Sequence, residues 1–151
     1  MMMRTHVLSA LTIGLAILPS VTHKFSFLPI IVLATLLPDI DCAQSYLGRA
    51  WFLRPLQWIT RHRGLLHSLT FCFLMTLLFA LFLPFIALPF FLGYALHLFA
   101  DSLTVEGIRP WWPAKIEMRG HIRTGGTIER GIFYTLCAMC VILFILLIIE
   151  N

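Results

Sequence analysis

The chain has 151 residues, of which 60% are hydrophobic and 12% charged, with a mean hydropathy of +0.91. This is more apolar surface than a globule of that length can bury, so the composition excludes an ordinary water-soluble domain and predicts an integral membrane protein. The formal net charge of +4 is too small to define a partner, so the distribution of charge matters more. No linker, repeat or low-complexity tract divides the sequence, and we expect a single domain over residues 1–151.

Five apolar stretches predict an all-α, polytopic membrane bundle. In chain order they cover residues 7–21, 25–37, 65–83, 85–100 and 132–149. The third and fifth approach the roughly 20 residues that a helix needs to cross the hydrocarbon core, while the others are shorter. Pro84 and Pro89 bracket the connection between the third and fourth stretches, which predicts a tight helical hairpin there.

The first stretch also resembles a signal peptide, because Arg4 precedes an apolar run. Residues 19–23 are a poor cleavage site, since they lack the pair of small residues that such a site needs. We therefore expect this helix to be retained, and His6 with it.

The basic residues predict the orientation of the bundle. If five helices cross the membrane, the segments before the first, between the second and third, and between the fourth and fifth share one side. Of the eleven Lys and Arg residues, all except Lys24 fall in these segments, and the positive-inside rule makes that side cytoplasmic. The same topology brings most of the acid and imidazole groups to this face: His6, Asp39, Asp41, His62, His67, His97, Asp101 and Glu129. We expect a multi-pass protein whose polar site and interfacial loops face the cytoplasm.

Carboxylates and imidazoles beside hydrocarbon are unfavourable unless they are paired, solvated or bound to a cation. His97 and Asp101 are four residues apart at the end of an apolar stretch, so a helix places both on one face, close enough to share a metal ion. Such a pair can also be a hydrogen-bonded structural couple. The neighbouring ligand types favour the metal site.

Asp39 and Asp41 follow Pro38, where the second helix is expected to end. Two carboxylates this close repel each other unless a cation or a proton intervenes, although a single Asp could simply cap a helix. We expect the pair to hold metal, or to divide between metal ligand and general base.

His62 and His67 flank Gly64. A continuous helix would separate the two rings by about 140°, so they converge only if the helix breaks at the glycine. The alternative is a pair of interfacial histidines that bind lipid phosphate. His6 and Glu129 have no local partner in the sequence, and only the predicted topology makes them candidates for the site.

Two loop segments, residues 49–61 and 109–113, mix basic and aromatic side chains. This mixture is typical of chain at the level of the lipid headgroups, and an aromatic belt with positive-inside charge explains most of it. Nucleic acid would attract the same residue types, but the apolar flanks make lipid phosphate the nearer anion. We expect membrane lipids as partners and no nucleic acid, and the sequence leaves the oligomeric state open.

The motifs, in this order, resemble the YdjM-like family of bacterial inner-membrane, metal-dependent hydrolases. The resemblance rests on residues 37–41 (LPDID), 62–68 (HRGLLHS) and 93–104 (GYALHLFADSLT), followed by Gly107 and Trp112-Pro113. It covers nearly the whole chain, from His6 to Glu129. It implies an inner-membrane location and a hydrolase activity without naming a substrate. The HxxxD element is also similar to one in zinc-dependent phospholipases C, which suggests phosphoester chemistry.

We therefore expect metal-assisted hydrolysis of an ester or phosphoester in a lipid or lipid-linked substrate. One or two divalent ions, zinc first with manganese or iron as alternatives, would lower the pKa of a water toward about 7. The expected metal ligands are His6, Asp39, Asp41, His62, His67, His97 and Asp101. The expected catalytic carboxylates are Asp39, Asp41 and Glu129, and the expected phosphoryl-binding residues are Arg61, Arg63 and Arg123.

Two other functions fit parts of the sequence. A metal-ion carrier would use the same ligand types, but would place them near the middle of the membrane at broken helices. A non-catalytic protein that binds anionic lipid would explain the arginines and tryptophans, but not the pairs of acidic groups.

Overall fold

The computed structural model describes residues 1–42, 45, 48–51, 54, 57 and 64–149, and this part of the chain is helical. It contains the helices α1 (Met3–Ile17), α2 (Lys24–Leu36), α4 (Leu69–Phe82), α5 (Pro84–Ser102) and α6 (Thr127–Ile149). Short 3-10 turns follow or precede them: η1 (Leu18–Ser20), η2 (Pro38–Asp41) and η4 (Leu65–His67). The described residues form no β-strand, only two isolated bridges in the loop after α5. The predicted all-α class is confirmed.

Helix length limits how many of these elements can cross a membrane. The helices α5 and α6, with 19 and 23 residues, are long and apolar enough to cross, and α4 is apolar but shorter. The 15 residues of α1 and the 13 of α2 rise only about 22 and 20 Å, less than the roughly 30 Å of the hydrocarbon core. The described part of the chain therefore has two candidate membrane spans, which is fewer than the five crossings expected from the sequence.

The helix boundaries follow the capping residues. The helix α4 begins later than predicted, because the Ser68 hydroxyl accepts a hydrogen bond from Phe71 N at 3.2 Å and so caps the helix at Leu69. Pro84 is the first residue of α5, where its missing N–H is not needed. Pro89 lies inside α5. The prediction that two prolines bracket the turn is therefore wrong, since only Pro84 belongs to it.

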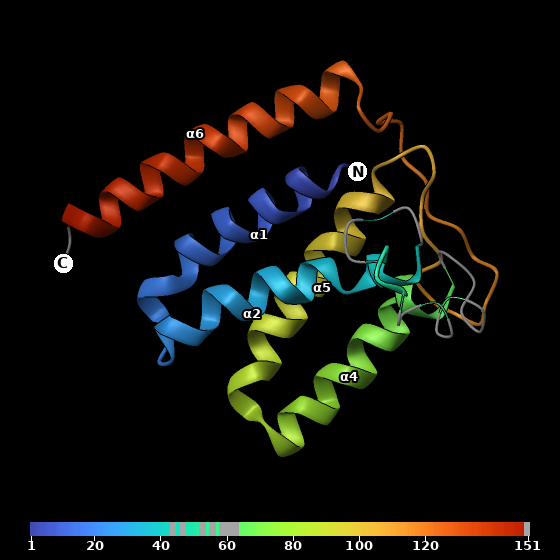
Figure 1. Cartoon of the computed structure of the whole chain (residues 1–151), viewed down its shortest axis with the longest axis horizontal. Helices are drawn as coiled ribbons and strands as arrows, with labels where there is room; N and C mark the ends of the chain where they lie inside the picture. Colours follow the sequence, from blue (N-terminus) through green and yellow to red (C-terminus); the bar gives the residue numbers. More distant parts are fainter. Residues whose placement is uncertain (43–44, 46–47, 52–53, 55–56, 58–63, 150–151) are drawn as a thin grey trace.

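The helices α2 and α5 pack closely against each other at Gly93. A Cβ atom at this position would lie 2.2 Å from the carbonyl oxygen of Ile31 and 3.0 Å from Cβ of Ala34, so only glycine allows this approach. The Thr35 hydroxyl donates to Gly93 O at 2.8 Å across the same contact. Figure 1 shows α2 crossing α5 near its middle. This contact sets where the end of α2 lies relative to the last turns of α5.

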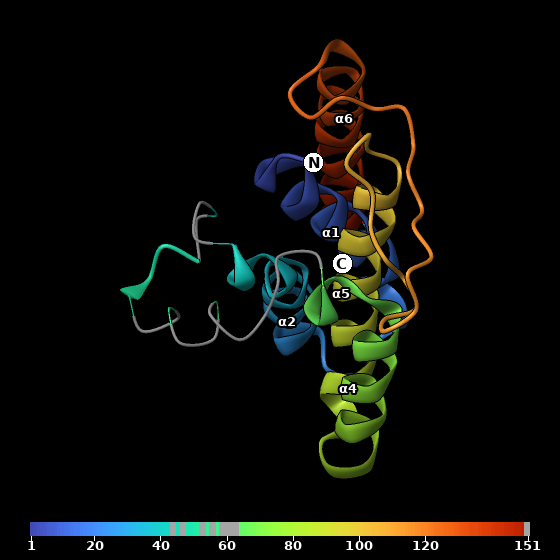
Figure 2. The ribbon, with the colours of Figure 1, turned by 90° about the vertical axis from the view of Figure 1, so that its right-hand side faces the viewer.

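The helices α4 and α5 form the expected hairpin around an apolar cluster of Cys72, Phe90, Tyr94 and Leu98, all buried. The Tyr94 hydroxyl donates a short hydrogen bond to Leu66 O and so ties the turn η4 to α5. The loop after α5, residues 103–126, folds back toward the start of α4, where Leu69 N donates to Pro110 O at 2.8 Å. Figure 2 shows this loop along the flank of α5 and α4.

The remaining helices pack on the other side of α2 and α5. The start of α2 and the middle of α1 share a second apolar cluster of Ala10, Phe27 and Ile31. The helix α6 runs beside α1 in the same direction (Figure 1). The start of α1, the end of α5 and the start of α6 therefore gather at one end of the molecule, and the candidate site lies there.

Candidate metal centre

His97 lies at the centre of the candidate site. Its side chain is fully buried, and within the described part of the chain neither of its ring nitrogens has a hydrogen-bond partner. The Nε2 atom lies 3.7 Å from Asp101 Oδ2 and 3.8 Å from Asp39 Oδ1, too far for hydrogen bonds. Buried imidazole nitrogens almost always have a hydrogen-bond partner. The arrangement therefore leaves a position for a further group between the ring and the two carboxylates.

Two groups of ligand atoms share His97. One contains His6, His97 and Asp101, all buried, and the other contains Asp39, His67 and His97; in each group the atoms lie within 4.8 Å of one another. His6 Nε2 is 3.3 Å from Asp101 Oδ1, and its ring stacks on that of His97 at 4.1 Å between centroids. His67 Nε2 is 3.7 Å from Asp39 Oδ1. Five of the seven expected ligands are therefore brought together.

The spacing and the chemistry of these atoms fit a divalent cation. Donor atoms placed about 2.0–2.1 Å from a tetrahedral ion lie about 3.3–3.4 Å from one another. The four nitrogen–oxygen separations in the two groups range from 3.3 to 3.8 Å. Mixed imidazole and carboxylate ligands suit zinc, manganese or iron, whereas calcium and magnesium prefer oxygen alone. The residues present therefore fit one or two such ions.

Local sequence explains how three segments, α5, η2 and η4, reach one point. His97 and Asp101 are one helical turn apart in α5 and face the same way. Pro38 opens the 3-10 turn η2 directly after α2, and this turn places Asp39 opposite His97. On the other side of His97, His67 is the last residue of the turn η4. This turn begins after Gly64 and is separate from α4, which starts at Leu69. Whether the chain breaks at Gly64 so that His62 converges with His67 stays a prediction, because His62 lies outside the described residues.

Asp41 lies behind His67 and not between the two ligand groups. Its Oδ2 atom is 3.3 Å from His67 Nδ1, and its side chain is fully buried. A carboxylate on Nδ1 orients the ring and directs Nε2 toward a metal, as in many carboxylate–histidine–metal triads. The structure thus separates the two aspartates predicted as a pair, with Asp39 on the Nε2 side of His67 and Asp41 on the Nδ1 side.

The charges of the site favour a cation. Burial lowers the pKa of His67, but the neighbouring carboxylates of Asp39 and Asp41, and the hydrogen bond between Nδ1 and Asp41, outweigh it and raise the pKa to about 9. Burial raises the pKa of Asp39, but the nearby imidazoles, that of His67 above all, bring it below its usual value. Both shifts show that the carboxylates stabilise positive charge at this point.

The other predicted site residues are placed differently. His62, Arg61 and Arg63 lie outside the described residues. Arg123 is exposed on the loop between α5 and α6. Glu129 is fully buried, and its carboxylate accepts hydrogen bonds from Met2 N, Thr5 and Gly125 N. The amino group of Met1 contacts Asp101 Oδ1.

Sequence reasoning missed two residues that support the site. One is Tyr94, which holds the turn that carries His67. Its polar hydroxyl one turn before His97 in an apolar helix was a usable signal. The other is Thr5, whose hydroxyl donates to Glu129 Oε1 at 3.1 Å. A threonine next to His6 carries no comparable signal, because its partner is 124 positions away.

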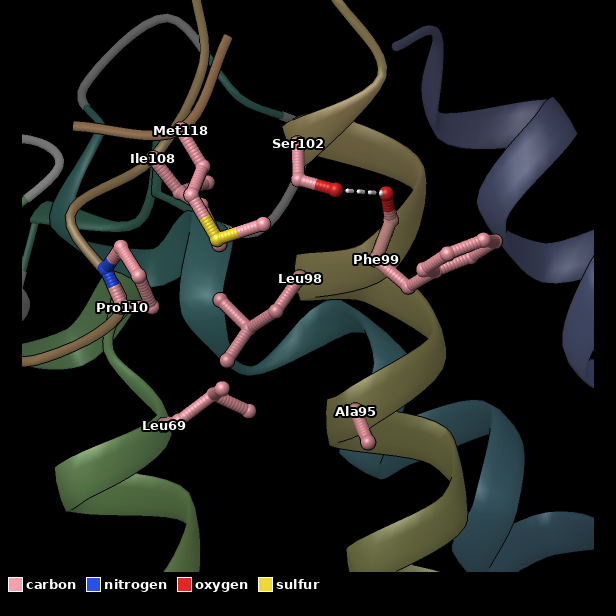
Figure 3. Close-up of a pocket in the computed structure, with 8 residues that line it drawn as sticks. All are labelled: Leu69, Ala95, Leu98, Phe99, Ser102, Ile108, Pro110 and Met118. Atoms are coloured by element: carbon pink, nitrogen blue, oxygen red, sulfur yellow. Dashed lines mark hydrogen bonds between the residues drawn. The ribbon is translucent and has the colours of Figure 1, made fainter. Parts of the chain in front are cut away.

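A separate apolar cavity of about 230 Å³ lies on the opposite side of α5 (Figure 3). Its lining residues are Leu69, Ala95, Leu98, Phe99, Ser102, Ile108, Pro110 and Met118. Helical spacing turns Ala95, Phe99 and Ser102 away from His97 and Asp101. None of the described residues that line the cavity is an acid or a histidine, and none of them is a ligand of the metal centre.

Comparison with known proteins connects this arrangement to a family. The inner membrane protein YdjM of Escherichia coli (strain K12) and that of Shigella flexneri are each 37% identical to the chain over 116 residues. These matches cover 69% of the chain and 59% of the relatives, so the chain spans less than two thirds of their length. The uncharacterized protein YvsG of Bacillus subtilis (strain 168) is 28% identical over 138 residues, or 84% of each protein. No solved structure matches the chain.

The model of the YdjM inner membrane protein family matches residues 1–151, the whole length of the sequence. The family resemblance expected from the three motifs is thus confirmed. This chain belongs to the YdjM inner membrane protein family.

Proposed function

We propose that this chain is a membrane-bound hydrolase that uses one or two divalent metal ions. Its substrate would be an ester or phosphoester of a lipid or lipid-linked molecule at the cytoplasmic face of the inner membrane. The observation that carries the proposal is the fully buried His97, whose two ring nitrogens have no hydrogen-bond partner in the described part of the chain and which faces two carboxylates. Groups of this kind are unfavourable in an apolar bundle unless a cation binds them.

The residues of the centre divide into metal ligands and one residue that orients a ligand. His6, Asp39, His67, His97 and Asp101 would hold the metal. A bound ion would supply Lewis acidity, which activates a water and polarises the bond to be cleaved. Asp41 would keep the His67 ring in its orientation through Nδ1.

The site opens at Asp39. Its side chain is 24% exposed, whereas the side chains of His67, His97 and Asp101 are at most 5% exposed. Substrate and water therefore reach the centre from the side of Asp39. Since its Oδ1 atom faces the imidazoles of His67 and His97, its Oδ2 atom would take the proton of the attacking water.

The charge of a phosphoryl group needs a separate partner. Arg61, Arg63 and Arg123 stay our candidates for this role, because a guanidinium binds phosphoryl oxygens through paired donors. A lipid substrate is favoured by the membrane family of the chain, since such a substrate is already concentrated in the plane of the bilayer.

The position of the ligands favours hydrolysis over ion transport. Asp39 follows α2, His67 precedes α4, and Asp101 lies in the last turn of α5. Carriers place their ligands near the middle of the membrane, at interrupted helices. A protein that only binds anionic lipid would have no use for buried imidazole and carboxylate groups.

The test uses protein purified in detergent and loaded with zinc or manganese. We expect bound metal in the wild type, loss of metal in His97→Ala and Asp101→Ala, and retention in His121→Ala, where an exposed histidine is removed. The wild type and His121→Ala should also release product from vesicles of anionic phospholipid in a metal-dependent way, whereas His97→Ala and Asp101→Ala should not. Equal metal content in all four proteins excludes the site. Metal binding without hydrolysis, together with ion flux into liposomes, establishes the carrier instead.

A further inference from the structure

Glu129 joins the beginnings of two helices. It lies in the first turn of α6 and is fully buried. Its Oε1 atom accepts hydrogen bonds from Met2 N at 2.6 Å and from the Thr5 hydroxyl at 3.1 Å, and its Oε2 atom accepts one from Gly125 N at 2.6 Å. Both oxygens of the Glu129 carboxylate thus accept hydrogen bonds, Oε1 from the start of the chain around α1 and Oε2 from Gly125 just before α6.

This carboxylate supplies a cap that α1 lacks in its own sequence. The residue before α1 is Met2, whose side chain makes no capping hydrogen bond, and no acidic residue lies in the first turn of the helix. The N-terminus of a helix favours negative charge, and the N–H of the residue before it needs an acceptor. Glu129 supplies both from α6, because its carboxylate accepts from Met2 N and from the Thr5 hydroxyl. It also accepts from Gly125 N, just before its own helix, where the backbone has a φ of +77°.

The turn that Glu129 holds is the turn that carries His6. The bonds to Met2 and Thr5 fix this first turn, and His6 follows Thr5 directly. His6 N itself donates to Met2 O at 3.3 Å. Its side chain reaches Asp101 and stacks on His97. A change in the position of this turn therefore moves His6, whereas the other four ligands lie on η2, η4 and α5.

We propose that Glu129 is a positioning residue that holds His6 in the metal centre. The inference rests on the proposed metal site and gives Glu129 a different role from the general base expected from sequence, because three donors of this chain already use its carboxylate. The alternative is that Glu129 only joins α1 to α6 and has no influence on metal binding.

A double-mutant cycle separates the two roles. The probe is Co²⁺ alone, whose binding is followed by its visible absorption during competition with a chelator. We expect Glu129→Ala to lower Co²⁺ affinity about 10–100-fold, the usual effect of losing a group that orients a ligand. In a His6→Ala background the same substitution should have no further effect, because the ligand it positions is gone. The matched control is Glu106→Ala, which removes an exposed glutamate of the preceding loop.

Two outcomes of the cycle contradict the proposal. One is a Glu129→Ala protein with wild-type affinity and absorption while His97→Ala loses Co²⁺. The other is an equal fold-loss with and without His6, which would show that Glu129 acts through general stability. A wild type that binds no Co²⁺ overturns the metal site itself, and this inference with it.

A milder variant and a metal-free measurement cover the case in which Glu129→Ala does not fold. Thr5→Val keeps the shape of the side chain but removes one of the three bonds, so it should lower Co²⁺ affinity in the same direction by a smaller factor. In metal-free protein, amide hydrogen exchange at Met2 or at Gly125 should be faster in Glu129→Gln than in Glu106→Gln, because the glutamine NH2 cannot accept a hydrogen bond and one of the two amides loses its acceptor. Equal exchange of both amides in the two variants contradicts the proposed contact.

Discussion

Replacing Gly93 by alanine should separate α2 from α5 and disturb the metal centre at the same time. The added methyl group would lie 2.2 Å from Ile31 O, and an ordinary contact needs at least 3.4 Å, so the helices must move apart by about 1.2 Å. Overpacking costs about 1–3 kcal/mol, and loss of the Thr35 bond to Gly93 O adds about 1–3 kcal/mol. The better helix propensity of alanine returns about 1 kcal/mol, which leaves a net loss of about 1–5 kcal/mol.

The same movement reaches the site through Asp39, which follows α2 and lies 3.8 Å from His97 on α5. Metal ligands tolerate displacements of about 0.5 Å, so we expect metal affinity to fall at least about tenfold. The assays are unfolding by denaturant in detergent and competition with a metal chelator.

The matched control for Gly93 is Gly131→Ala in α6, where an added Cβ meets nothing within 4 Å. This variant should keep its metal affinity and gain up to about 1 kcal/mol in unfolding free energy. If the Gly93 and Gly131 variants behave alike in both assays, the close contact of α2 and α5 does not position the site.

Three further predictions follow from single contacts. Asp41→Asn should lower metal affinity about 10–100-fold in chelator competition by weakening the orientation of His67, and unchanged affinity would contradict that role. Ser68→Ala should lower the unfolding free energy by about 1 kcal/mol through loss of the cap on Phe71 N; a change within the error of the denaturant titration would refute the cap. The metal-free protein should lose stability between pH 6.5 and about 9, because the raised pKa of His67 stabilises the folded state fully below pH 6.5 and this contribution disappears as the ring loses its proton. Thermal unfolding across this range tests the last point, and a His67→Gln protein with the same pH profile would contradict it.

The parts of the site that could be predicted are those set by local spacing and by topology. His97 and Asp101 share a face because they are four residues apart in a helix, and Pro38 ends α2 where its ring stops helix propagation. The arrangement of basic loops suggested which helix ends meet. That prediction brought His6 and His67 to the same point, although His6 has no neighbouring partner in the sequence.

The parts that could not be predicted depend on packing between distant residues. Which aspartate faces which nitrogen of His67 is decided by the turn η2, not by the spacing of Asp39 and Asp41. Glu129 looked like a candidate base because two of its three donors, on Met2 and Thr5, lie more than a hundred positions away in the sequence. The five expected membrane crossings are not confirmed in the described part of the chain, because apolar composition does not fix helix length and α1 and α2 are short helices.

X-ray absorption of the zinc-loaded protein is the most direct test of a shared cation held by imidazole and carboxylate groups. The predicted spectrum has nitrogen and oxygen neighbours at about 2.0–2.1 Å, with outer-shell scattering from histidine that weakens in His97→Ala. A shell of sulfur at about 2.3 Å, or a wild-type spectrum without histidine scattering, would show that the metal binds elsewhere and contradict the site described for His97.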